Sequence, residues 1–290
     1  MLLNNPFKTP AVIIHRGMQP YLKYNLEITS KTNEIILVGS EDLAFLARDN
    51  KNVHFVDIAN YENKESIVNL KEYFKNYSTN DFEFEWRCFE RVFILQDFIK
   101  EYELDSVFHL DSDAVLLVDI NNLIFEKNCG YLTPAFQDNF RMESSIHFGL
   151  IDLNFCNEFI KLFNEIYKKG DKFYLIKEKI DYHNKKSLKG GICDMTLYYL
   201  LKKEKYLNPQ NFMKEVKHIN SDEYVFLNNI NLSEGYYSKK NFIMRNSYVK
   251  ISNNSVYDTI QKKEIKLAGI HFQGTGKKRL NKFLKYKLRT

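Results

Sequence analysis

A short apolar run that ends in two closely spaced aspartates constrains this chain more than any other feature. Residues 107–110 are long enough for one buried strand and carry the β-branched and aromatic residues that strands favour. Asp111, Ser112 and Asp113 follow directly, and apolar residues resume over 114–118. Two carboxylates at the end of a buried strand offer the oxygen ligands that Mg²⁺ and Mn²⁺ prefer. The preceding strand carries the information, since an Asp-x-Asp triplet also arises by chance in a chain this rich in aspartate.

The composition is that of a globular protein. The chain has 290 residues, of which 44% are hydrophobic and 15% aromatic, so it can bury a sizeable core. The four cysteines lie far apart without a Cys-x-x-Cys pair, which argues against a disulfide scaffold or a zinc ribbon and favours reduced thiols in a cytosol. We expect one domain over residues 1–275, with lobes at 1–120 and 121–275, and a separate tail at 276–290.

Strands and helices alternate through the first half. The apolar runs at 11–15, 35–38 and 53–58 predict strands, and Pro20 suits the first turn of a helix that ends near Ser30. A second helix is expected from Glu41. Units of this kind predict an α/β fold, with a parallel or mixed sheet flanked by helices.

A long helix is predicted immediately before the aspartate strand, over residues 82–102. Phe82, Trp86, Phe89 and Phe93 recur at helical spacing and form one apolar face, which we assign to the core. Ligands of open α/β sheets bind outside the carboxyl ends of the strands, where Arg16 and the aspartates should meet. His109, within the aspartate strand, is also assigned to the core.

The second half is less regular. Strands are predicted over 131–136 and 146–153, helices over 155–168 and 194–203, and a turn at Asn253-Asn254. Asp194 stands in the first turn of its helix, where an acid is also favourable for purely structural reasons.

Four landmarks in this order resemble the GT-A fold metal-dependent glycosyltransferases, above all the bacterial lipooligosaccharide galactosyltransferase and glycogenin type. The landmarks are Asp111-Ser112-Asp113, the stretch I-H-F-G-L-I-D-L at 146–153, G-I-C-D at 191–194 and H-F-Q-G-T-G-K at 271–277. The resemblance covers roughly residues 11–277. It departs from the family pattern where Lys278-Arg279 replace a Pro-Trp, His147 stands at the family's Asn, and Cys193-Asp194 replace a carboxamide and an acid.

The resemblance implies a metal site and a nucleotide-sugar donor. Asp113 and His271 would ligate the ion, and Asp111 would be a further ligand or a partner of the ribose. Because the set includes an imidazole, Mn²⁺ suits it better than Mg²⁺. The ion would bridge the two phosphates of a donor, which we expect to be a UDP-sugar.

Further residues receive roles from the same resemblance. Asp194 would act at the sugar, as general base if the enzyme inverts configuration or as a partner of donor hydroxyls if it retains it. The sugar or acceptor side would include His147 and Gln137. Donor contacts are expected from His15, Arg16, Arg91, Asp111, Ser112, Gly191, Gly274 and Lys277. For Arg91 a pairing with Glu90 or Asp97 on the helix surface stays open, as does a core role for the two histidines His15 and His147.

Two other functions fit parts of the sequence. One is a Mg²⁺-dependent phosphohydrolase or phosphotransferase with Asp111 as nucleophile, but the position of the aspartates and the following Ala114-Val115 do not match that class. The other is a non-catalytic nucleotide-sugar-binding protein.

The C-terminal segment carries the basic charge. Residues 277–290 hold seven Lys or Arg and no acid, against +5 for the whole chain. Leu280, Phe283, Leu284 and Leu288 recur at helical spacing, which predicts a basic amphipathic helix on an anionic membrane surface. The alternative is a solvated terminal helix. We expect no nucleic-acid partner, no targeting or membrane-spanning segment, a cytoplasmic location with peripheral contact to the inner membrane face, and a glycan or glycolipid acceptor.

Overall fold

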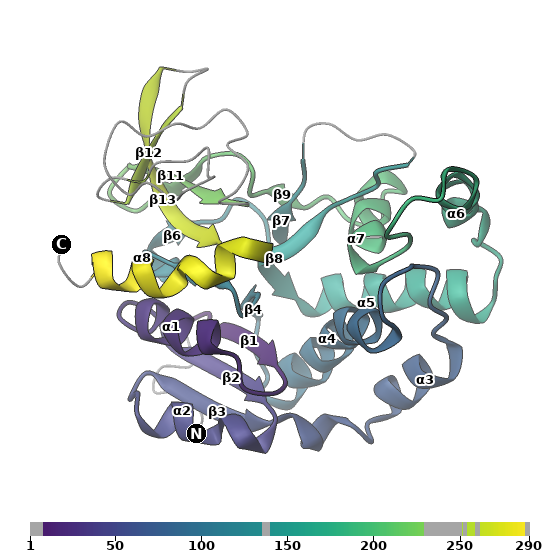
Figure 1. Ribbon diagram of the computed structural model, residues 1–290, viewed down its shortest axis with the longest axis horizontal. Coiled ribbons are helices and arrows are strands. Elements are labelled where there is room, and N and C mark those ends of the chain that lie inside the picture. Colours follow the sequence, from purple (N-terminus) through teal and green to yellow (C-terminus); the bar gives the residue numbers. More distant parts are fainter. Residues whose placement is uncertain (1–7, 135–139, 229–250, 252–253, 259–261, 288–290) are drawn as a thin grey trace.

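Two mixed β-sheets with helices packed on them make up the protein (Figure 1). The computed structural model describes residues 8–134, 140–228, 251, 254–258 and 262–287. The main sheet has seven strands in the order β3-β2-β1-β4-β8-β7-β9, and a second sheet has six. The predicted α/β class, with a mixed sheet and flanking helices, is therefore confirmed.

The first four strands of the main sheet are parallel and come from the first 110 residues. They are β3 (Val53–Asp57), β2 (Ile35–Gly39), β1 (Ala11–His15) and β4 (Ser106–Leu110). The connecting helices are α1 (Pro20–Thr29), α2 (Ala44–Arg48), α3 (Glu65–Tyr73) and α4 (Phe82–Glu101). Pro20 is the first residue of α1, where its missing N–H leaves no bond unmade. These parallel strands all end at one edge, which is the edge that carries the aspartates.

The other half of the main sheet is joined to β4 by an antiparallel strand pairing. It consists of β8 (Ser145–Asp152), β7 (Gly130–Leu132) and β9 (Gln210–Asn211). In the register of β4 with β8, His109 lies opposite Gly149, and the Asp111 N–H donates to the His147 carbonyl oxygen at 3.2 Å. Pairing of these two strands therefore brings His147 to the aspartates.

The second sheet receives the chain immediately after the aspartates. Its strands are β12 (Ser255–Asp258), β13 (Lys263–His271), β11 (Glu223–Leu227), β10 (Val216–His218), β6 (Leu123–Ile124) and β5 (Ala114–Leu116). β5 pairs antiparallel with β13, with Ala114 opposite His271. The Asp111–Asp113 turn thus joins the two sheets, and the end of β13 lies beside it.

The main sheet is buried on both faces, because its strands alternate between two core clusters. Val12, Ile36 and Val38 pack with α3, α4, α5 (Leu153–Phe163) and α7 (Asp194–Lys203). Ala11 and Ile13 pack with α1, α2 and the second sheet. The remaining helix, α6 (Tyr174–Lys186), lies at the outer edge near α7 (Figure 1). His109 is buried as predicted, and its Nδ1 faces the Ile146 carbonyl oxygen at 2.8 Å.

Several predicted boundaries and one core assignment are wrong. Phe82, in the first turn of α4, is 50% exposed, whereas Trp86, Phe89 and Phe93 are buried. The helix expected from Glu41 does begin there, as a 3₁₀ turn that continues directly into α2, so this start is confirmed. The helix expected over 155–168 is α5 followed by a π-helical turn. In the 131–136 prediction, β7 ends at Leu132 and residues 135–136 lie outside the described part, as does Asn253 of the predicted turn.

The C-terminal segment corrects the expected lipid contact. Helix α8 (Leu280–Lys287) packs along α1, and its side chains Leu280, Phe283 and Leu284 are buried in a core with β13 (Figure 1). The apolar face that was expected to lie on a membrane is covered by the protein itself, while Leu288 lies outside the described residues. Among the described helices, none combines the length and the apolar character that a membrane crossing requires.

Candidate active site

A polar chain from α1 holds the aspartate turn in place. Asn25 is fully buried, and its side-chain amide donates to the carbonyl oxygen of Ser112 at 3.0 Å. Its own oxygen accepts from the Thr29 hydroxyl at 2.8 Å, and that hydroxyl oxygen accepts from the Leu116 N–H. A buried chain in which each polar group has a partner fixes the backbone on both sides of Asp113. Sequence reasoning missed Asn25 and Thr29, although two polar residues four apart among the leucines of α1 were a signal.

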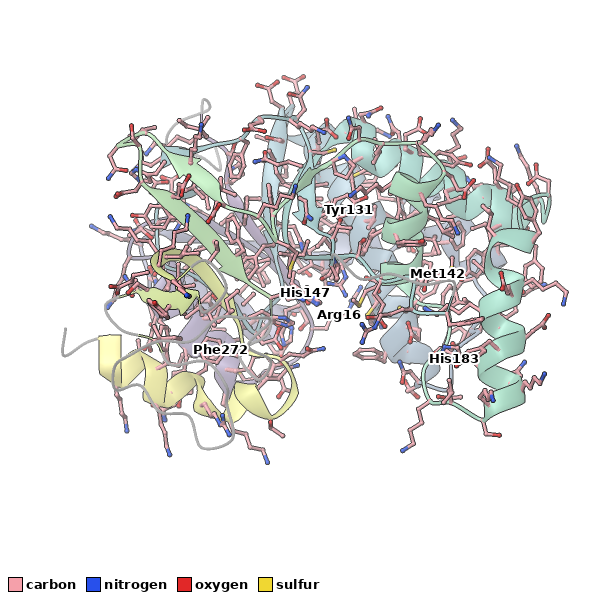
Figure 2. All side chains as sticks on the ribbon, turned by 90° about the horizontal axis from the view of Figure 1, so that it is seen from above. Arg16, Tyr131, Met142, His147, His183 and Phe272 are labelled. Carbon is pink, nitrogen blue, oxygen red and sulfur yellow. The ribbon has the colours of Figure 1, made fainter. Side chains whose placement is uncertain are left out.

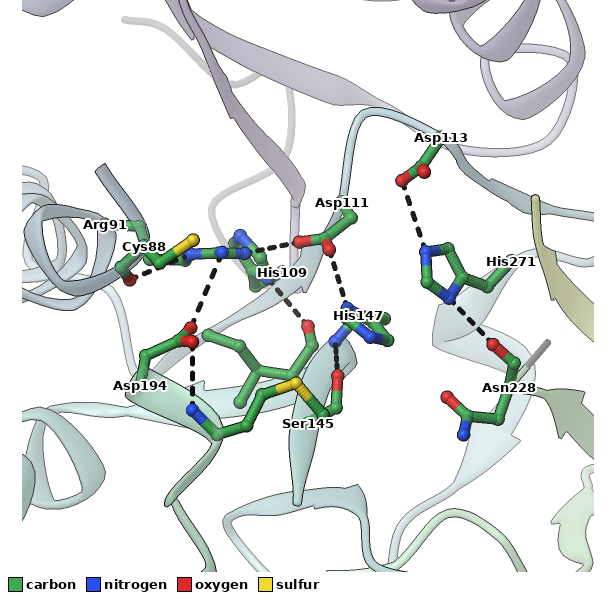
Figure 3. A network of polar contacts seen from close by, with 12 residues as sticks. Cys88, Arg91, His109, Asp111, Asp113, Ser145, His147, Asp194, Asn228 and His271 are labelled. Carbon is green, nitrogen blue, oxygen red and sulfur yellow. Dashed lines mark hydrogen bonds and ion pairs between the residues drawn. The ribbon is translucent and has the colours of Figure 1, made fainter. Parts of the chain in front are cut away.

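His271 lies against Asp113 because β13 ends opposite β5. The Phe272 N–H donates to the Asp113 carbonyl oxygen at 2.8 Å, and His271 Nε2 lies 3.3 Å from Asp113 Oδ1 (Figure 3). Both side chains are buried. Burial opposes the charge on each, but their mutual attraction prevails, so the pKa of Asp113 is lowered and that of His271 is raised.

His147 completes the cluster around the aspartates. Its Nδ1 lies 2.6 Å from Asp111 Oδ2, and its ring lies 4.0 Å from that of His271, centroid to centroid (Figure 3). Asp111, His147 and His271 each offer a ligand atom, and these atoms lie within 4.8 Å of one another. One oxygen and two nitrogen donors this close together suit a single divalent ion, so the donor set fits a metal site. His147, expected on the sugar side, therefore joins the candidate ligands.

Arg91 lies between two acids rather than on the helix surface. Its Nη1 is 2.5 Å from Asp111 Oδ1, and its Nη2 is 3.5 Å from Asp194 Oδ2 (Figure 3). The alternative pairing with Glu90 or Asp97 is not seen, since Glu90 instead pairs with Arg16 and Arg87. Burial opposes the charge of Asp111, but Arg91 and His147 outweigh it and hold the pKa of this carboxyl well below its usual range.

Asp194 is the acid whose titration burial perturbs most clearly. Burial raises the pKa of Asp194 to about 6, with Glu85 and Asp111 adding to the shift and Arg91 opposing it. Its Oδ1 accepts from the Met195 N–H at 2.9 Å at the start of α7. The carboxyl is thus an acid that titrates near neutral pH inside a cleft, as general bases and sugar-binding acids do.

Gly191 positions Asp194 through a close backbone contact. Its φ is +151°, and a Cβ there would lie 2.2 Å from the Tyr77 carbonyl oxygen. Gly191 also forms a β-bridge with Ser78, so the loop before α7 is joined to the loop before α4. This glycine serves the backbone, which supports a positioning role for a residue that was expected to touch the donor.

Asp111, Asp113 and Asp194 line one cleft of about 560 Å³, together with Arg91 and His147. Figure 2 shows Arg16 and His147 in the middle of the molecule, between the α8 side and the α6 side. Of the residues predicted for the site, the cleft is lined by His15, Arg16, Arg91, Asp111, Ser112, Asp113, His147, Asp194 and Lys277. His271 contacts Asp113 but does not itself line the cleft, and neither do Gly191 and Gly274. Gln137 lies outside the described residues.

The cationic end of the cleft lies beside the aspartates. Lys277 Nζ is 3.2 Å from Asp113 Oδ2 and stands over the ring of Tyr21. Arg16 pairs with Glu62 at 2.7 Å and Glu90 at 3.0 Å. His15 shares this end, where burial and the Lys277 charge lower its pKa, so its ring is neutral at pH 7. Lys277 is thus the cation beside the aspartates at this end, while the charge of Arg16 is offset by two glutamates.

Glu85 is a further cleft residue that sequence reasoning missed. It lines the cleft, yet its side chain is only 1% exposed. An available signal was its position four residues before Phe89, on the apolar side of the α4 pattern, where an acid is unusual.

Comparison with known proteins shows the fold. No protein-family model matches the sequence, and no curated protein matches it. Among solved structures, the chain is similar to apo mouse xyloside xylosyltransferase 1, with 11% identity, 92% of this chain and 98% of that chain covered, and a TM-score of 0.51. It is also similar to the PaToxG glycosyltransferase, with 14% identity over 70% of this chain and 74% of that chain and a TM-score of 0.42. The likeness to the xylosyltransferase over nearly its full length shows a glycosyltransferase fold of the GT-A kind.

Proposed function

We propose that the protein is a metal-dependent glycosyltransferase that moves a sugar from a UDP-sugar to a hydroxyl of a glycan or glycolipid. The observation that carries the proposal is the convergence of Asp111, Asp113, His147, His271 and Lys277 at one end of a cleft that also holds Asp194. These residues come from four separate segments, at 111–113, 147, 194 and 271–277, and meet near the carboxyl ends of the parallel strands, where ligands of open sheets bind.

The ion would be held by Asp111, Asp113 and His271, with His147 as a further donor. Mixed oxygen and nitrogen donors favour Mn²⁺ over Mg²⁺. When bound, a divalent ion would offset the negative charge of the donor's diphosphate as it leaves. The nucleotide is assigned to the lobe of residues 1–120 and the sugars to 121–275, with Arg91 reaching across.

The chain's own groups supply the rest of the chemistry. Lys277 places a cation beside Asp113, where it would contact the same phosphate oxygens. His15, Arg16 and Ser112 line that end of the cleft and would orient the nucleotide, and Gly274 would let the backbone at the start of the last 3₁₀ turn approach it. Asp194 would accept a hydrogen bond from a hydroxyl of the transferred sugar. His147 and Gln137 would face the sugar and acceptor.

The hydrolase alternative is disfavoured by the surroundings of Asp111. One carboxylate oxygen is bonded to Arg91 and the other to His147. An aspartate nucleophile needs an oxygen directed at phosphorus, whereas each oxygen of this carboxylate faces Arg91 or His147, an arrangement that suits a metal ligand or a positioning group better than a nucleophile.

Incubation with a panel of nucleotide sugars, Mn²⁺ and model glycosides tests the proposal. We expect transfer, or slow hydrolysis, of at least one UDP-sugar, with loss of activity in EDTA and recovery with Mn²⁺. Asp113→Ala should lose most of the rate while remaining folded by circular dichroism. Binding of a UDP-sugar without transfer or hydrolysis would instead support a non-catalytic binding protein, and full activity in EDTA would contradict the metal site.

A further inference from the structure

Glu85 lines the cleft and has one buried carboxylate oxygen without a hydrogen-bond partner in the described part of the chain. Its side chain is 1% exposed, and its Oε1 accepts from the Asn80 side-chain amide at 2.7 Å. Its Oε2 is buried and has no hydrogen-bond partner within the described part of the chain. No ion pair to Glu85 forms there either, although Arg91 and Arg87 lie on the same helix. One of the two oxygens of this buried carboxylate therefore lacks a hydrogen-bond donor.

A buried hydrogen-bond acceptor without a donor costs free energy, so the unpaired oxygen of Glu85 indicates that a ligand group binds there. Leaving a buried charged group unpaired costs more than any single hydrogen bond returns, and such atoms are rare unless a ligand or water satisfies them. A carboxylate only accepts hydrogen bonds, so the missing partner is an O–H or N–H donor. We therefore expect a ligand in the cleft to donate a hydrogen bond to Glu85.

Asp194 is a second acid that lines the same cleft as Glu85. Glu85, Cys193 and Asp194 all line this cleft, Glu85 from α4 and the other two from the start of α7, and α4 packs against α7. Arg91, the cation on this side, is already shared between Asp111 and Asp194. Within the described part of the chain Glu85 has no ion pair and Asp194 shares Arg91 with Asp111, so this side of the cleft favours hydroxyls and repels anions.

We propose that Glu85 and Asp194 select the transferred sugar: they accept hydroxyls of a neutral sugar and exclude sugars that carry a carboxylate. This inference rests on the proposed function, because it requires the diphosphate of a donor to lie at Asp113 and Lys277. Arg91 contacts Asp111 beside the diphosphate and Asp194 on its other side, and Glu85 lines the same cleft. The sugar attached to the diphosphate would therefore lie toward the two acids. A uronate at this place would meet like charges in a water-poor site.

Calorimetric titration in Mn²⁺ with matched donors tests the selection. The probes are UDP, UDP-glucose with UDP-glucuronate, and UDP-galactose with UDP-galacturonate, so each pair differs only in a CH₂OH or a carboxylate at C6. The wild type should bind the neutral member of at least one pair more tightly, by about tenfold or more. Glu85→Gln keeps the side-chain shape and should reduce this ratio at least about fivefold while leaving UDP affinity unchanged. Glu85→Asp keeps the charge and should retain exclusion of the uronate but weaken binding of the neutral sugar.

Glu101→Gln is the control, because it removes the same charge from the other end of α4, where Glu101 pairs with Lys64 at 3.5 Å. It should leave every ratio unchanged. If UDP binds and Glu85→Gln leaves the ratio as in the wild type, the selection by Glu85 is wrong while the proposed function stands. An equal change in Glu101→Gln would also overturn it, because net charge would then explain the effect. If UDP itself does not bind the wild type, the UDP-sugar assignment and the selection fail together.

Discussion

His271 points its Nε2 at Asp113 Oδ1, 3.3 Å away, and its Nδ1 at the Asn228 carbonyl oxygen, 2.7 Å away. A carbonyl oxygen can only accept, so Nδ1 carries a hydrogen. In the neutral ring the lone pair then lies on Nε2, on the side of the aspartates. Metal-binding histidines are oriented in this way by a carbonyl behind the ring. The observation supports a ligand role for His271 independently of its sequence motif.

Removing this imidazole should weaken metal binding specifically. We expect His271→Ala to lower Mn²⁺ affinity by about tenfold to a hundredfold, as loss of a ligand or its orienting partner does. Electron paramagnetic resonance of free Mn²⁺ during titration measures this directly. His218→Ala is the control, since His218 lies on β10 away from the cleft. Equal Mn²⁺ affinity in both variants would remove His271 from the ligand set.

Asp194 should make the stability of the metal-free protein depend on pH. Its pKa is about 6 in the folded chain against an ordinary 3.8, so the folded chain binds the proton more tightly. Protonation therefore favours folding, and the contribution of Asp194 to the free energy of unfolding falls as pH rises from about 4 to about 6. Asp194→Asn cannot titrate. Relative to wild type, the variant should gain stability over this interval, by up to about 3 kcal/mol.

Urea unfolding in EDTA at pH 4.5 and pH 7.5 measures this difference, and other titrating groups cancel between the two proteins. At pH 7.5 with Mn²⁺, Asp194→Asn should also lose turnover while retaining UDP binding. Stability curves that run parallel across the pH range would show that Asp194 titrates normally.

Gly191 should tolerate no side chain. Gly191→Ala would place a Cβ against the Tyr77 carbonyl oxygen and strain the backbone at φ +151°. We expect a loss of about 1–3 kcal/mol in the free energy of unfolding. Gly190→Ala is a matched control, because Gly190 has a φ of +84° but nothing within 4 Å of its added Cβ. Thermal unfolding of both variants separates the close contact from backbone strain; equal melting temperatures would deny the contact any importance.

The buried amide of Asn25 should support the aspartate turn from α1. Asn25→Ala leaves the Ser112 carbonyl oxygen and the Thr29 hydroxyl without this partner. We expect a loss of about 1–3 kcal/mol in stability and weaker Mn²⁺ binding. Asn220→Ala, in an exposed turn, should change neither quantity. A destabilised Asn25 variant with unaltered Mn²⁺ affinity would show that the amide serves folding alone.

The sequence predicted those parts of the fold in which local pattern and tertiary structure agree. Strands β1, β2 and β4 are apolar runs buried on both faces, and α4 shows its core face at Trp86, Phe89 and Phe93. In each case the pattern predicts only that the apolar residues are buried, and it does not depend on which element covers them. The two aspartates could be predicted equally well from the sequence, because a turn that follows a buried strand is a local feature.

The rest depended on strand pairing that local pattern does not encode. After β4 the chain leaves the main sheet, and β5 pairs with β13 of the second sheet. This pairing brings His271 beside Asp113. His147 reaches Asp111 through the register of β8 against β4. Glu85 is an acid on an apolar helix face, and only the packing of α4 beside α7 shows that a cleft lies in front of it. Long-range pairing decides all three, so the ligand set was predicted only in part.

The C-terminal helix gives the sharpest contrast between pattern and structure, and the last prediction follows from it. An amphipathic stripe such as Leu280, Phe283 and Leu284 requires an apolar partner but does not say which. Here the partner is α1 and β13, and Phe283 is fully buried with its ring 5.4 Å from that of Phe272. Phe283→Ala should therefore lower the free energy of unfolding by about 3–5 kcal/mol, the cost of a large cavity in a core.

Lys282→Ala, one residue earlier on the exposed face, should change stability by less than about 0.5 kcal/mol. Chemical unfolding of the two variants, followed by circular dichroism, makes the comparison. If α8 instead left the body to lie on lipid, Phe283→Ala would unfold like Lys282→Ala and would lose binding to anionic vesicles. We expect Phe283→Ala to be much less stable than Lys282→Ala and to show no specific loss of vesicle binding, because the protein itself already covers the apolar face that includes Phe283.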